Sequence, residues 1–349
     1  GVDNDPVNLI LQGLKASIAD GWGGSMVATE ISDVLFGTPA PVRSEANLGV
    51  LKEDHVNIVA HGHEPVLSEM ILAAAADPDL VARAEALGAK GINVVGMCCT
   101  GNEIIMRHGI PLAGNFMQQE LAVITGAVDA MIVDVQCIMP ALGDLCECFH
   151  TQFISTSYKA KFPGAVHMQF NEENALTIAK EIVAKAVENY NNRVPEKVFI
   201  PNEKAECMVG FSAEAIIKAL GGTLDPLLDA IKSGVIKGIA GVVGCNNPKI
   251  KHDEGHVELV RELIKNDLLV VNTGCNAIAT AKVGLMLPEA ADQAGDGLKG
   301  VCQALGIPPV LHMGSCVDIS RILVVCAAVA DALGVDISDL PVAGAAPEW

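Results

Sequence analysis

Aromatic residues, basic residues and long apolar runs are all scarce in this sequence of 349 residues. Phe, Trp and Tyr make up 3% of a chain that is 50% hydrophobic, so small aliphatic side chains must build the core, as in helices packed on buried parallel strands. The net charge of -19 argues against binding to nucleic acid or to an anionic membrane surface. No apolar run reaches the roughly 18 residues of a membrane span and no signal peptide is visible, so we expect a cytoplasmic protein.

Several common motifs are absent as well. Eleven cysteines, an odd number in a chain of this length, do not fit a small disulfide-rich domain, so we expect reduced thiols. Closely spaced Cys pairs of the structural zinc type are missing from the stretches described below. There is no phosphate-binding P-loop, no Gly-x-Gly-x-x-Gly motif directly after a strand and no Gly-x-Ser-x-Gly motif, which leaves nucleotide binding and hydrolysis without their usual anchors. Cys207, Cys302 and Cys326 lie among apolar residues and are expected in the core.

The sequence does contain six stretches in which an apolar run of the β type is followed by a metal-ligating residue. In four of them Gly stands immediately before the Cys or within three residues of it, which lets the backbone turn sharply. Open α/β sheets bind ligands beyond the carboxyl ends of their strands, so these residues should gather in one pocket. The stretches are VNIVAHGHEP with His63, INVVGMCCTGNE with Cys98 and Cys99, MIVDVQCIMP with Cys137, IAGVVGCNNP with Cys245, LLVVNTGCNA with Cys275 and PPVLHMGSCVD with Cys316.

The spacing of these stretches indicates one ligand for each βα unit. His63 and Cys99 are 36 positions apart, and Cys99 and Cys137 are 38 apart. We therefore predict an α/β fold in which two Rossmann-like parallel-sheet domains hold a metal cluster at the seam between them. A polar stretch ending at Pro195 predicts the domain boundary, which gives a short N-terminal helical segment at 1–45, a first domain at 46–195 and a second domain at 196–349.

The N-terminal segment, residues 1–45, is predicted to be mainly helical. Asp5 can cap a helix whose first turn contains Pro6, and apolar residues follow at helical spacing. The segment DGWGGSM is expected to break this helix at Gly21, Gly23 and Gly24.

Neighbouring residues leave two choices open within the ligand set. Of His61 and His63, only one is expected to reach a metal while the other is satisfied by a hydrogen bond, and we favour His63 as the ligand. Cys98 and Cys99 are adjacent and cannot easily share one coordination direction. One of them should be a ligand in the resting protein and the other a close neighbour.

A separate motif offers a possible second metal site. Cys146, Cys148 and His150 alternate, so an extended segment would place all three on one face. A spacing of one residue is not typical of a zinc loop, and packing behind Cys137 is the alternative interpretation.

The side chains of the six stretches, cysteines and one histidine, favour soft metals. Thiolates combined with one imidazole suit iron-sulfur clusters and thiophilic nickel or copper better than magnesium or calcium. The stretches supply more ligands than one [4Fe-4S] cluster needs. A larger or mixed-metal cluster is therefore expected.

Taken together, the motifs resemble those of the nickel-containing, anaerobic carbon monoxide dehydrogenases across essentially the whole chain. DGWGGSM, NLGVLKEDHVNIVAHGHEP, GMCCTGNE, VDVQCIMP, GVVGCNNP, NTGCNA and HMGSCVDISRI occur in the expected order. The resemblance implies reversible oxidation of CO with water to CO2, two protons and two electrons at a Ni-Fe-S cluster (C-cluster, Ni-4Fe-4S type). In this family the cluster lies between two Rossmann-like domains.

The resemblance also implies a role for each candidate residue. His63 and Cys99 would ligate a unique iron that acts as a Lewis acid on water, and Cys316 would ligate the nickel that binds CO. The iron-sulfur portion would be held by Cys137, Cys245 and Cys275. Cys98 resembles a neighbouring thiol that becomes a ligand in an altered redox state, and Asp20 is expected to be an outer base or hydrogen-bond partner.

Further partners follow from the family. Its members carry [4Fe-4S] relay clusters on an N-terminal cysteine-rich segment and form homodimers, and they continue beyond the Cys316 region to a catalytic lysine. We therefore expect an internal fragment that is inactive by itself. Expected partners are a ferredoxin-like electron carrier, a nickel-insertion ATPase and an acetyl-CoA synthase.

Two alternatives remain at this point. The related hybrid-cluster proteins reduce hydroxylamine on a similar fold, but they would require glutamate ligands and another cysteine pattern. A non-catalytic cluster scaffold is the alternative from a different class, and loss of ligands would have favoured it.

Overall fold

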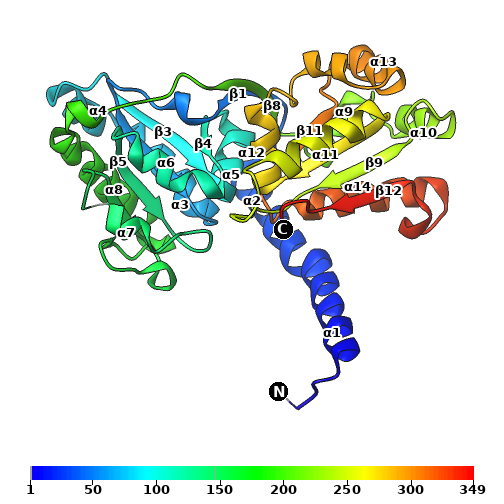
Figure 1. The fold of residues 1–349 in the computed structure, drawn as a ribbon, viewed down its shortest axis with the longest axis horizontal. Coiled ribbons are helices and arrows are strands. Elements are labelled where there is room, and N and C mark those ends of the chain that lie inside the picture. The colour runs from blue at the N-terminus through cyan, green and yellow to red at the C-terminus, as the bar shows by residue number, and fades with distance from the viewer. Residues whose placement is uncertain (1, 146) are drawn as a thin grey trace.

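In the computed structural model, which describes residues 2–145 and 147–349, two sheets lie side by side with helices around them (Figure 1). The first sheet has the order β7-β6-β5-β2-β3-β4-β1-β8, and the second has the order β11-β10-β9-β12. Every strand pair in the described residues is parallel except β1 with β8, which confirms the predicted α/β class. The strands are β1 (Val42–Ala46), β2 (Val56–His61), β3 (Ile92–Met97), β4 (Leu112–Gly114), β5 (Val128–Val133), β6 (Gln152–Ser155), β7 (Val166–His167), β8 (Ala205–Val209), β9 (Gly238–Val242), β10 (Leu268–Thr273), β11 (Val310–Gly314) and β12 (Val342–Ala345).

Neighbouring strands end together at one edge of each sheet. In the first sheet, the last residue of β2, His61, lies opposite Met97 at the end of β3. In the second sheet, Thr273 at the end of β10 lies opposite Gly314 at the end of β11. Because the strands are parallel, the residues that follow these ends are brought close to one another.

Helices cover both faces of the first sheet because successive strand residues point to opposite sides. Ile58 in β2 packs in a cluster with α3 and α8, whereas Val59 packs in another cluster with α6 and α7. No helix in the described parts of the chain is long and apolar enough to cross a bilayer. The helices are α1 (Pro6–Ala19), α2 (Ser25–Phe36), α3 (Pro65–Ala75), α4 (Pro78–Ala86), α5 (Cys98–His108), α6 (Gln119–Ile124), α7 (Leu142–Leu145), α8 (Ala175–Asn189), α9 (Ala213–Ala219), α10 (Asp225–Lys232), α11 (Glu254–Lys265), α12 (Gly274–Lys282), α13 (Asp296–Leu305) and α14 (Ile319–Leu333).

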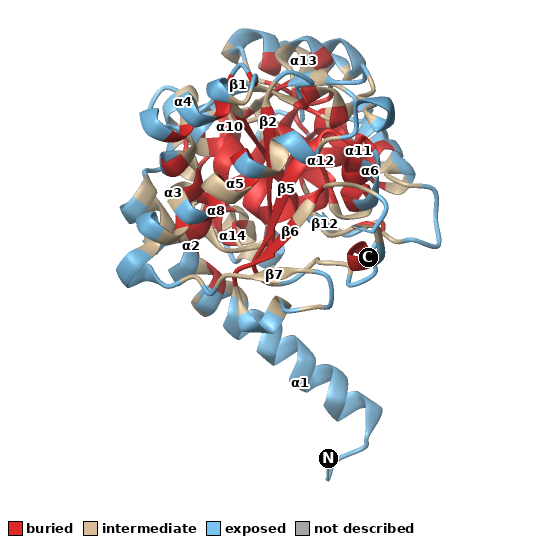
Figure 2. Ribbon diagram, turned by 90° about the vertical axis from the view of Figure 1, so that its left-hand side faces the viewer, coloured by how far each residue is buried: buried red, intermediate tan, exposed pale blue. Residues whose placement is uncertain are grey.

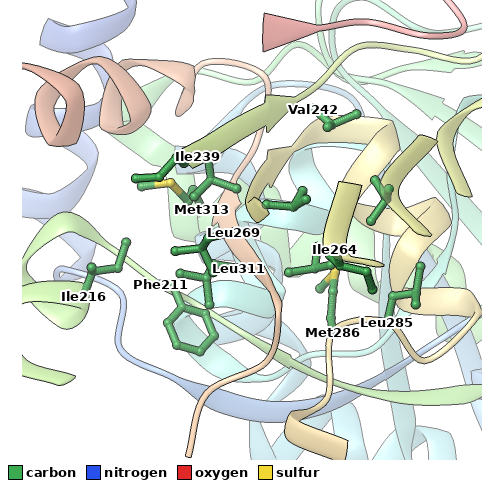
Figure 3. Packing of buried hydrophobic residues seen from close by; sticks show 14 of the residues in the cluster. Phe211, Ile216, Ile239, Val242, Ile264, Leu269, Leu285, Met286, Leu311 and Met313 are labelled. Carbon is green, nitrogen blue, oxygen red and sulfur yellow. The ribbon is translucent and has the colours of Figure 1, made fainter. Parts of the chain in front are cut away.

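The second sheet has an aliphatic core of its own. Leu269 and Leu311 from neighbouring strands pack against each other in this cluster (Figure 3). Cys207 and Cys302 are fully buried in the same cluster, and Cys326 packs at its edge. These three cysteines therefore act as small apolar residues, as the sequence predicts.

The N-terminal helices differ from the expectation in two respects. Asp20–Gly24 forms a single π-helical turn that joins α1 directly to α2, so the predicted break at the glycines was wrong. The extra residue of a π turn absorbs the glycines without ending the helix. The predicted helical segment also includes most of β1, which begins at Val42. Helix α1 has no buried residue and projects from the body of the molecule (Figure 2).

Strand β8 crosses the predicted domain boundary. Ala205–Val209 lies after residue 195, yet it pairs antiparallel with β1 at the edge of the first sheet. The two sheets therefore do not divide at Pro195, and the division of the chain into domains stays a prediction.

Candidate metal centre

The structure brings the predicted ligands together at the seam between the two sheets. Each of these residues follows the carboxyl end of a strand, three strands coming from each sheet. Helices α5 and α12 begin at or beside the cysteines, so the chain turns from strand to helix at the site. The residues are His63 after β2, Cys98 and Cys99 after β3, Cys137 after β5, Cys245 after β9, Cys275 after β10 and Cys316 after β11.

The two sheets are in contact at the seam through sulfur atoms. The backbone N–H of Cys316 donates a hydrogen bond to Sγ of Cys99 across a distance of 3.2 Å. The Cys245 thiol is within hydrogen-bond reach of Cys275 in its own sheet and of Cys137 in the first sheet. The sulfur atoms of both halves therefore face one shared volume.

His63 presents one ring nitrogen to this volume. Its Nδ1 donates to the carbonyl oxygen of Val135 at 3.1 Å, so the neutral ring has its lone pair on Nε2. Nε2 lies 3.7 Å from Sγ of Cys137. A hydrogen bond from the other nitrogen is the usual way to fix the tautomer of a metal-binding histidine. His61, in contrast, donates from Nε2 to the carbonyl oxygen of Cys137 at 3.0 Å, and burial lowers its pKa to about 4.

Asp134 fixes the loop that carries His63. Its Oδ1 accepts from the backbone N–H of His63 at 2.7 Å and from that of Val135, and its Oδ2 accepts from Glu64 at 3.0 Å. Gly62 has φ +130, and a Cβ there would collide with the carboxylate. The glycine is therefore required because Asp134 approaches the backbone so closely.

Cys98 and Cys99 are held by a buried amide. Cys98 has φ +56, a left-handed conformation that is uncommon for a residue with a side chain. Nδ2 of Asn102 donates to the carbonyl oxygen of Cys98 at 3.0 Å and to that of Gly274 at 3.2 Å, so this amide also connects the two sheets. Its Oδ1 accepts from Nε2 of His312 at 2.9 Å.

Cys137 also stands in a strained turn. Gln136 and Cys137 have φ of +60 and +54. The carbonyl oxygen of Cys137 accepts from Nε2 of Gln119 at 2.6 Å as well as from His61. Strained backbone that is held by several partners is typical of functional sites. Cys137 and Cys245 also line a surface depression together with Phe116.

The second sheet holds its cysteines differently. Nε2 of His256 donates to the carbonyl oxygen of Cys245 at 3.1 Å, and its Nδ1 accepts from Asn276 at 3.0 Å. Gly274, which precedes Cys275, has φ +63, and a Cβ there would lie 2.5 Å from Sγ of Cys316. Only glycine leaves room for this sulfur atom.

The thiols strongly influence one another's protonation. Contact with Cys316 lowers the pKa of Cys99 to about 5, with a further contribution from His63 and against the effect of burial. Neighbouring thiols hold the pKa of Cys245 far below its usual range. Burial alone would lower the pKa of His63, but the sulfur atoms of Cys137 and Cys99 raise it to about 11. The lowered pKa values favour thiolates at Cys99 and Cys245, and the proton held by His63 would be released when a metal binds, so the group is suited to cations.

The donors do not surround a single point. Among residues 2–145 and 147–349, no three His, Cys, Asp or Glu side chains are arranged to hold one metal ion. A cluster of several metals takes its protein ligands one by one around its periphery, whereas a zinc ion needs four ligands at about 2.0–2.3 Å. The soft donors and the close approach permitted by Gly274 therefore fit a metal-sulfur cluster better than a single ion.

Asp20 lies apart from the sulfur group. Its carboxylate is exposed and accepts from Oγ of Ser25 at 3.0 Å. None of the described contacts joins it to a cysteine or to His63.

The second candidate site is described only in part, because Cys146 lies outside the described residues. Cys148 is exposed, and Nε2 of His150 is hydrogen-bonded to Oδ1 of Asp129 at 2.9 Å. His150 therefore bonds to a carboxylate at the amino end of β5, on the opposite edge of the sheet from Cys137.

Sequence reasoning missed the residues that support the ligands. Asp134 and Asn102 stand within the quoted motifs VDVQC and CCTGNE, three and four positions from a cysteine. A polar residue in an otherwise apolar strand end was the available signal for Asp134. His256 and Gln119 carry no comparable signal, because their partners are backbone carbonyls in other stretches, 11 and 18 positions away.

The chain belongs to the Prismane/CO dehydrogenase family, whose model matches residues 1–349. It is 70% identical to carbon monoxide dehydrogenase 1 of Methanosarcina mazei over 349 residues, which are 100% of this chain and 56% of that protein. Carbon monoxide dehydrogenase 1 of Carboxydothermus hydrogenoformans is 52% identical, with 100% of this chain and 57% of that protein covered. The chain thus spans about half the length of the curated relatives that it matches.

Solved structures agree with this assignment and with the fold. An as-isolated, nickel-free carbon monoxide dehydrogenase from Thermococcus sp. AM4, produced without its maturase, matches with a TM-score of 0.98 and 63% identity over 100% of this chain and 55% of that one. An acetyl-CoA synthase/carbon monoxide dehydrogenase with NiZn[Fe4S4] and NiNi[Fe4S4] clusters in its alpha subunits matches with a TM-score of 0.95 and 46% identity, covering 100% and 54%. The two-sheet architecture is therefore that of carbon monoxide dehydrogenases.

Proposed function

We propose that this chain holds the catalytic cluster of a carbon monoxide dehydrogenase, which oxidises CO with water to CO2, two protons and two electrons and also runs in reverse. The observation that carries the proposal is the meeting of six cysteines and His63 from both sheets at one seam. The family membership supports it.

The donor set suits a Ni-Fe-S cluster of the Ni-4Fe-4S type. His63 and Cys99 would hold one iron, Cys316 would hold the nickel, and Cys137, Cys245 and Cys275 would hold the iron-sulfur portion. When bound, this group would supply a soft site for CO and a Lewis-acidic site for water. Cys98, buried beside Cys137 and Cys275, would serve as an alternative thiolate.

The remaining residues prepare the site for this chemistry. The Nδ1 hydrogen bond of His63 keeps Nε2 free for a metal. Burial of Cys99 and Cys275 keeps bulk water from the sulfur atoms. Asp20 is proposed as an outer proton acceptor, which would require it to face the site in the complete protein.

The partners are also part of the proposal. A related protein of Moorella thermoacetica is named carbon monoxide dehydrogenase/acetyl-CoA synthase subunit beta, which supports association with an acetyl-CoA synthase. We further propose a homodimer with [4Fe-4S] relay clusters, a ferredoxin-like electron acceptor and loading by a nickel-insertion ATPase. The ten described cysteines are all free, which supports a reducing, cytoplasmic location.

A metal and activity assay on the same sample tests the function. The protein that contains these 349 residues is produced anaerobically together with nickel-insertion factors, and nickel, iron, sulfide and CO-dependent viologen reduction are measured. We expect about one nickel per chain and CO-dependent activity, both lost in Cys316→Ala because the nickel loses its thiolate. Iron without nickel, and no activity with CO, would overturn the proposal and favour a hybrid-cluster enzyme or a scaffold.

A further inference from the structure

A buried network of charged side chains connects the N-terminal helices to both halves of the seam. It contains two guanidinium groups and three carboxylates, and all five side chains are largely shielded from water. A buried charge is costly unless it is paired, and even a buried ion pair adds little net stability because desolvation offsets the attraction. The network therefore points to a role in fixing geometry. We call it the seam network; its members are Asp33 in α2, Glu103 and Arg107 in α5, and Ser315, Asp318 and Arg321 around the start of α14.

Asp33 is the centre of the network. Its Oδ1 accepts from Arg107 of the first half at 2.7 Å, and both of its oxygens accept from Arg321 of the second half at 2.7 Å. One carboxylate from the N-terminal segment thus bridges two helices that belong to different halves of the molecule. Bidentate contacts of this type fix orientation as well as distance.

The other ends of the network reach the residues beside the sulfur atoms. Glu103, which accepts from Arg107 at 2.5 Å, also accepts from Oγ of Ser315 at 2.7 Å. Asp318 accepts from the backbone N–H of Ser315 at 2.8 Å. Ser315 directly precedes Cys316, whose own N–H donates to Sγ of Cys99.

We propose that the seam network positions Cys316 against Cys99, so that Asp33, Glu103 and Ser315 are positioning residues for the nickel side of the site. The role of these residues in nickel binding rests on the proposed function. The relative position of the two cysteines does not, because it can be measured in protein without metal. Helix α5 begins at Cys98, and α14 follows the loop of Cys316, so each half of the network carries one of the two sulfur atoms. If the two helices moved relative to each other, the distance between these sulfur atoms would therefore change.

The test measures the approach of the two thiols in metal-free protein. Diamide oxidises two neighbouring thiols to a disulfide: each thiol loses a proton and an electron, and the N=N bond of diamide accepts both pairs to give a hydrazine. The rate of Cys99–Cys316 cross-linking is followed by peptide mass spectrometry in wild type, Asp33→Asn and the milder Ser315→Ala. We expect both variants to cross-link about tenfold more slowly, because misplacement by about 1 Å has large effects on such reactions.

Asp129→Asn is the matched control. Asp129 is also a buried carboxylate, pairing with Arg193 and His150, but it lies at the amino end of β5, away from the sulfur atoms. This variant should lower the melting temperature as much as Asp33→Asn does and should cross-link within about twofold of wild type. Unchanged cross-linking in both network variants, or equal slowing in Asp129→Asn, would overturn the inference.

A second readout separates this inference from the proposed function. In protein loaded with metal, the nickel-to-iron ratio should fall in Asp33→Asn and Ser315→Ala and stay unchanged in Asp129→Asn. If wild type itself binds no nickel, the proposed function fails, while the cross-linking rates still decide whether the network positions Cys316.

Discussion

Two of the sulfur-bearing loops in each sheet are held by different means, although Gly314 with Asp318 in the second sheet repeats the arrangement of Gly62 with Asp134. In the first sheet, residues with side chains adopt left-handed backbone at Cys98, Gln136 and Cys137, and Asp134 accepts from the backbone N–H groups of His63 and Glu64 in the neighbouring loop. In the second sheet, Gly244, before Cys245, and Gly274, before Cys275, take the positive φ angles. Neutral side chains such as His256 then hold the carbonyl oxygens.

The first arrangement strains the backbone, whereas the second leaves room for neighbouring atoms. A residue with a Cβ in left-handed backbone costs on the order of 1–2 kcal/mol. The hydrogen bonds from Asn102 to Cys98 and from Gln119 to Cys137 must offset this cost. A glycine avoids that cost and leaves room, which at Gly274 is used by the sulfur of Cys316. Substitutions in the loops of the first sheet should therefore mainly lower the stability of the protein. Substitutions of the glycines in the second sheet should mainly reduce metal binding.

Gly62→Ala should produce the largest loss of stability. A Cβ at this position would collide with Asp134, and the backbone conformation at φ +130 is one that residues with side chains rarely adopt. The Asp134 carboxylate would have to leave the N–H groups of His63 and Glu64. We expect the free energy of unfolding to fall by about 3 kcal/mol or more in urea titrations of metal-free protein.

Gly88→Ala is the control that separates the collision with Asp134 from the cost of the backbone conformation. Gly88 also has a positive φ, +94, but a Cβ there would meet no atom within 4 Å. It should lose clearly less stability than Gly62→Ala. Equal losses of stability in the two variants would show that the collision with Asp134 adds nothing to the cost of the backbone conformation.

Gly274→Ala should affect metal binding more than stability. The backbone cost at φ +63 is about 1 kcal/mol, but the added Cβ would lie 2.5 Å from Sγ of Cys316 and displace it. We expect nickel content to fall several-fold while the unfolding midpoint changes little. Gly306→Ala has the same backbone conformation, φ +66, with no neighbour within 4 Å, so it should retain its nickel. Nickel loss in both variants would contradict a specific role for the space at Gly274.

Sequence reasoning succeeded where the signal is local. Apolar runs of the β type predict strands near 237–243, 267–273 and 309–313, and β9, β10 and β11 agree within two residues at each end. In parallel sheets such runs end at a common edge, so the position of the ligands follows from the strand ends alone. The N-terminal turn shows the limit of this approach, because Gly23 and Gly24 predict a break that a π turn accommodates.

The supporting residues could not be predicted, because their partners are distant in sequence. Asn102 bonds to Gly274, and Asp33 bonds to Arg321, pairs separated by 172 and 288 positions. Nothing in the local pattern distinguishes these polar residues from others in amphipathic helices. Their roles follow only from the docking of the two sheets and of α2.

The last expected effect depends on pH and concerns Asp253, a carboxylate that contacts residues of both sheets. It accepts from Asn115 at 2.8 Å and pairs with Lys282 at 2.5 Å. Although burial alone would raise its pKa, His252 and Lys282 hold the pKa well below its usual value. Its contribution to stability is therefore present above about pH 4, the unfolded value, and is lost as the pH falls through the folded value.

Asp253→Asn should lower the free energy of unfolding of metal-free protein by about 2 kcal/mol at pH 7. Asn tolerates the left-handed backbone at this position, φ +66, so the loss reports the charge. Wild type loses the same contribution in acid, so the gap between the two proteins should narrow as urea titrations move from pH 7 toward pH 3. The exposed pair of Asp292 with Lys299 provides the control, and Asp292→Asn should leave stability almost unchanged at both pH values. A gap that stays constant with pH would mean that hydrogen bonding, rather than the charge on Asp253, joins the two halves here.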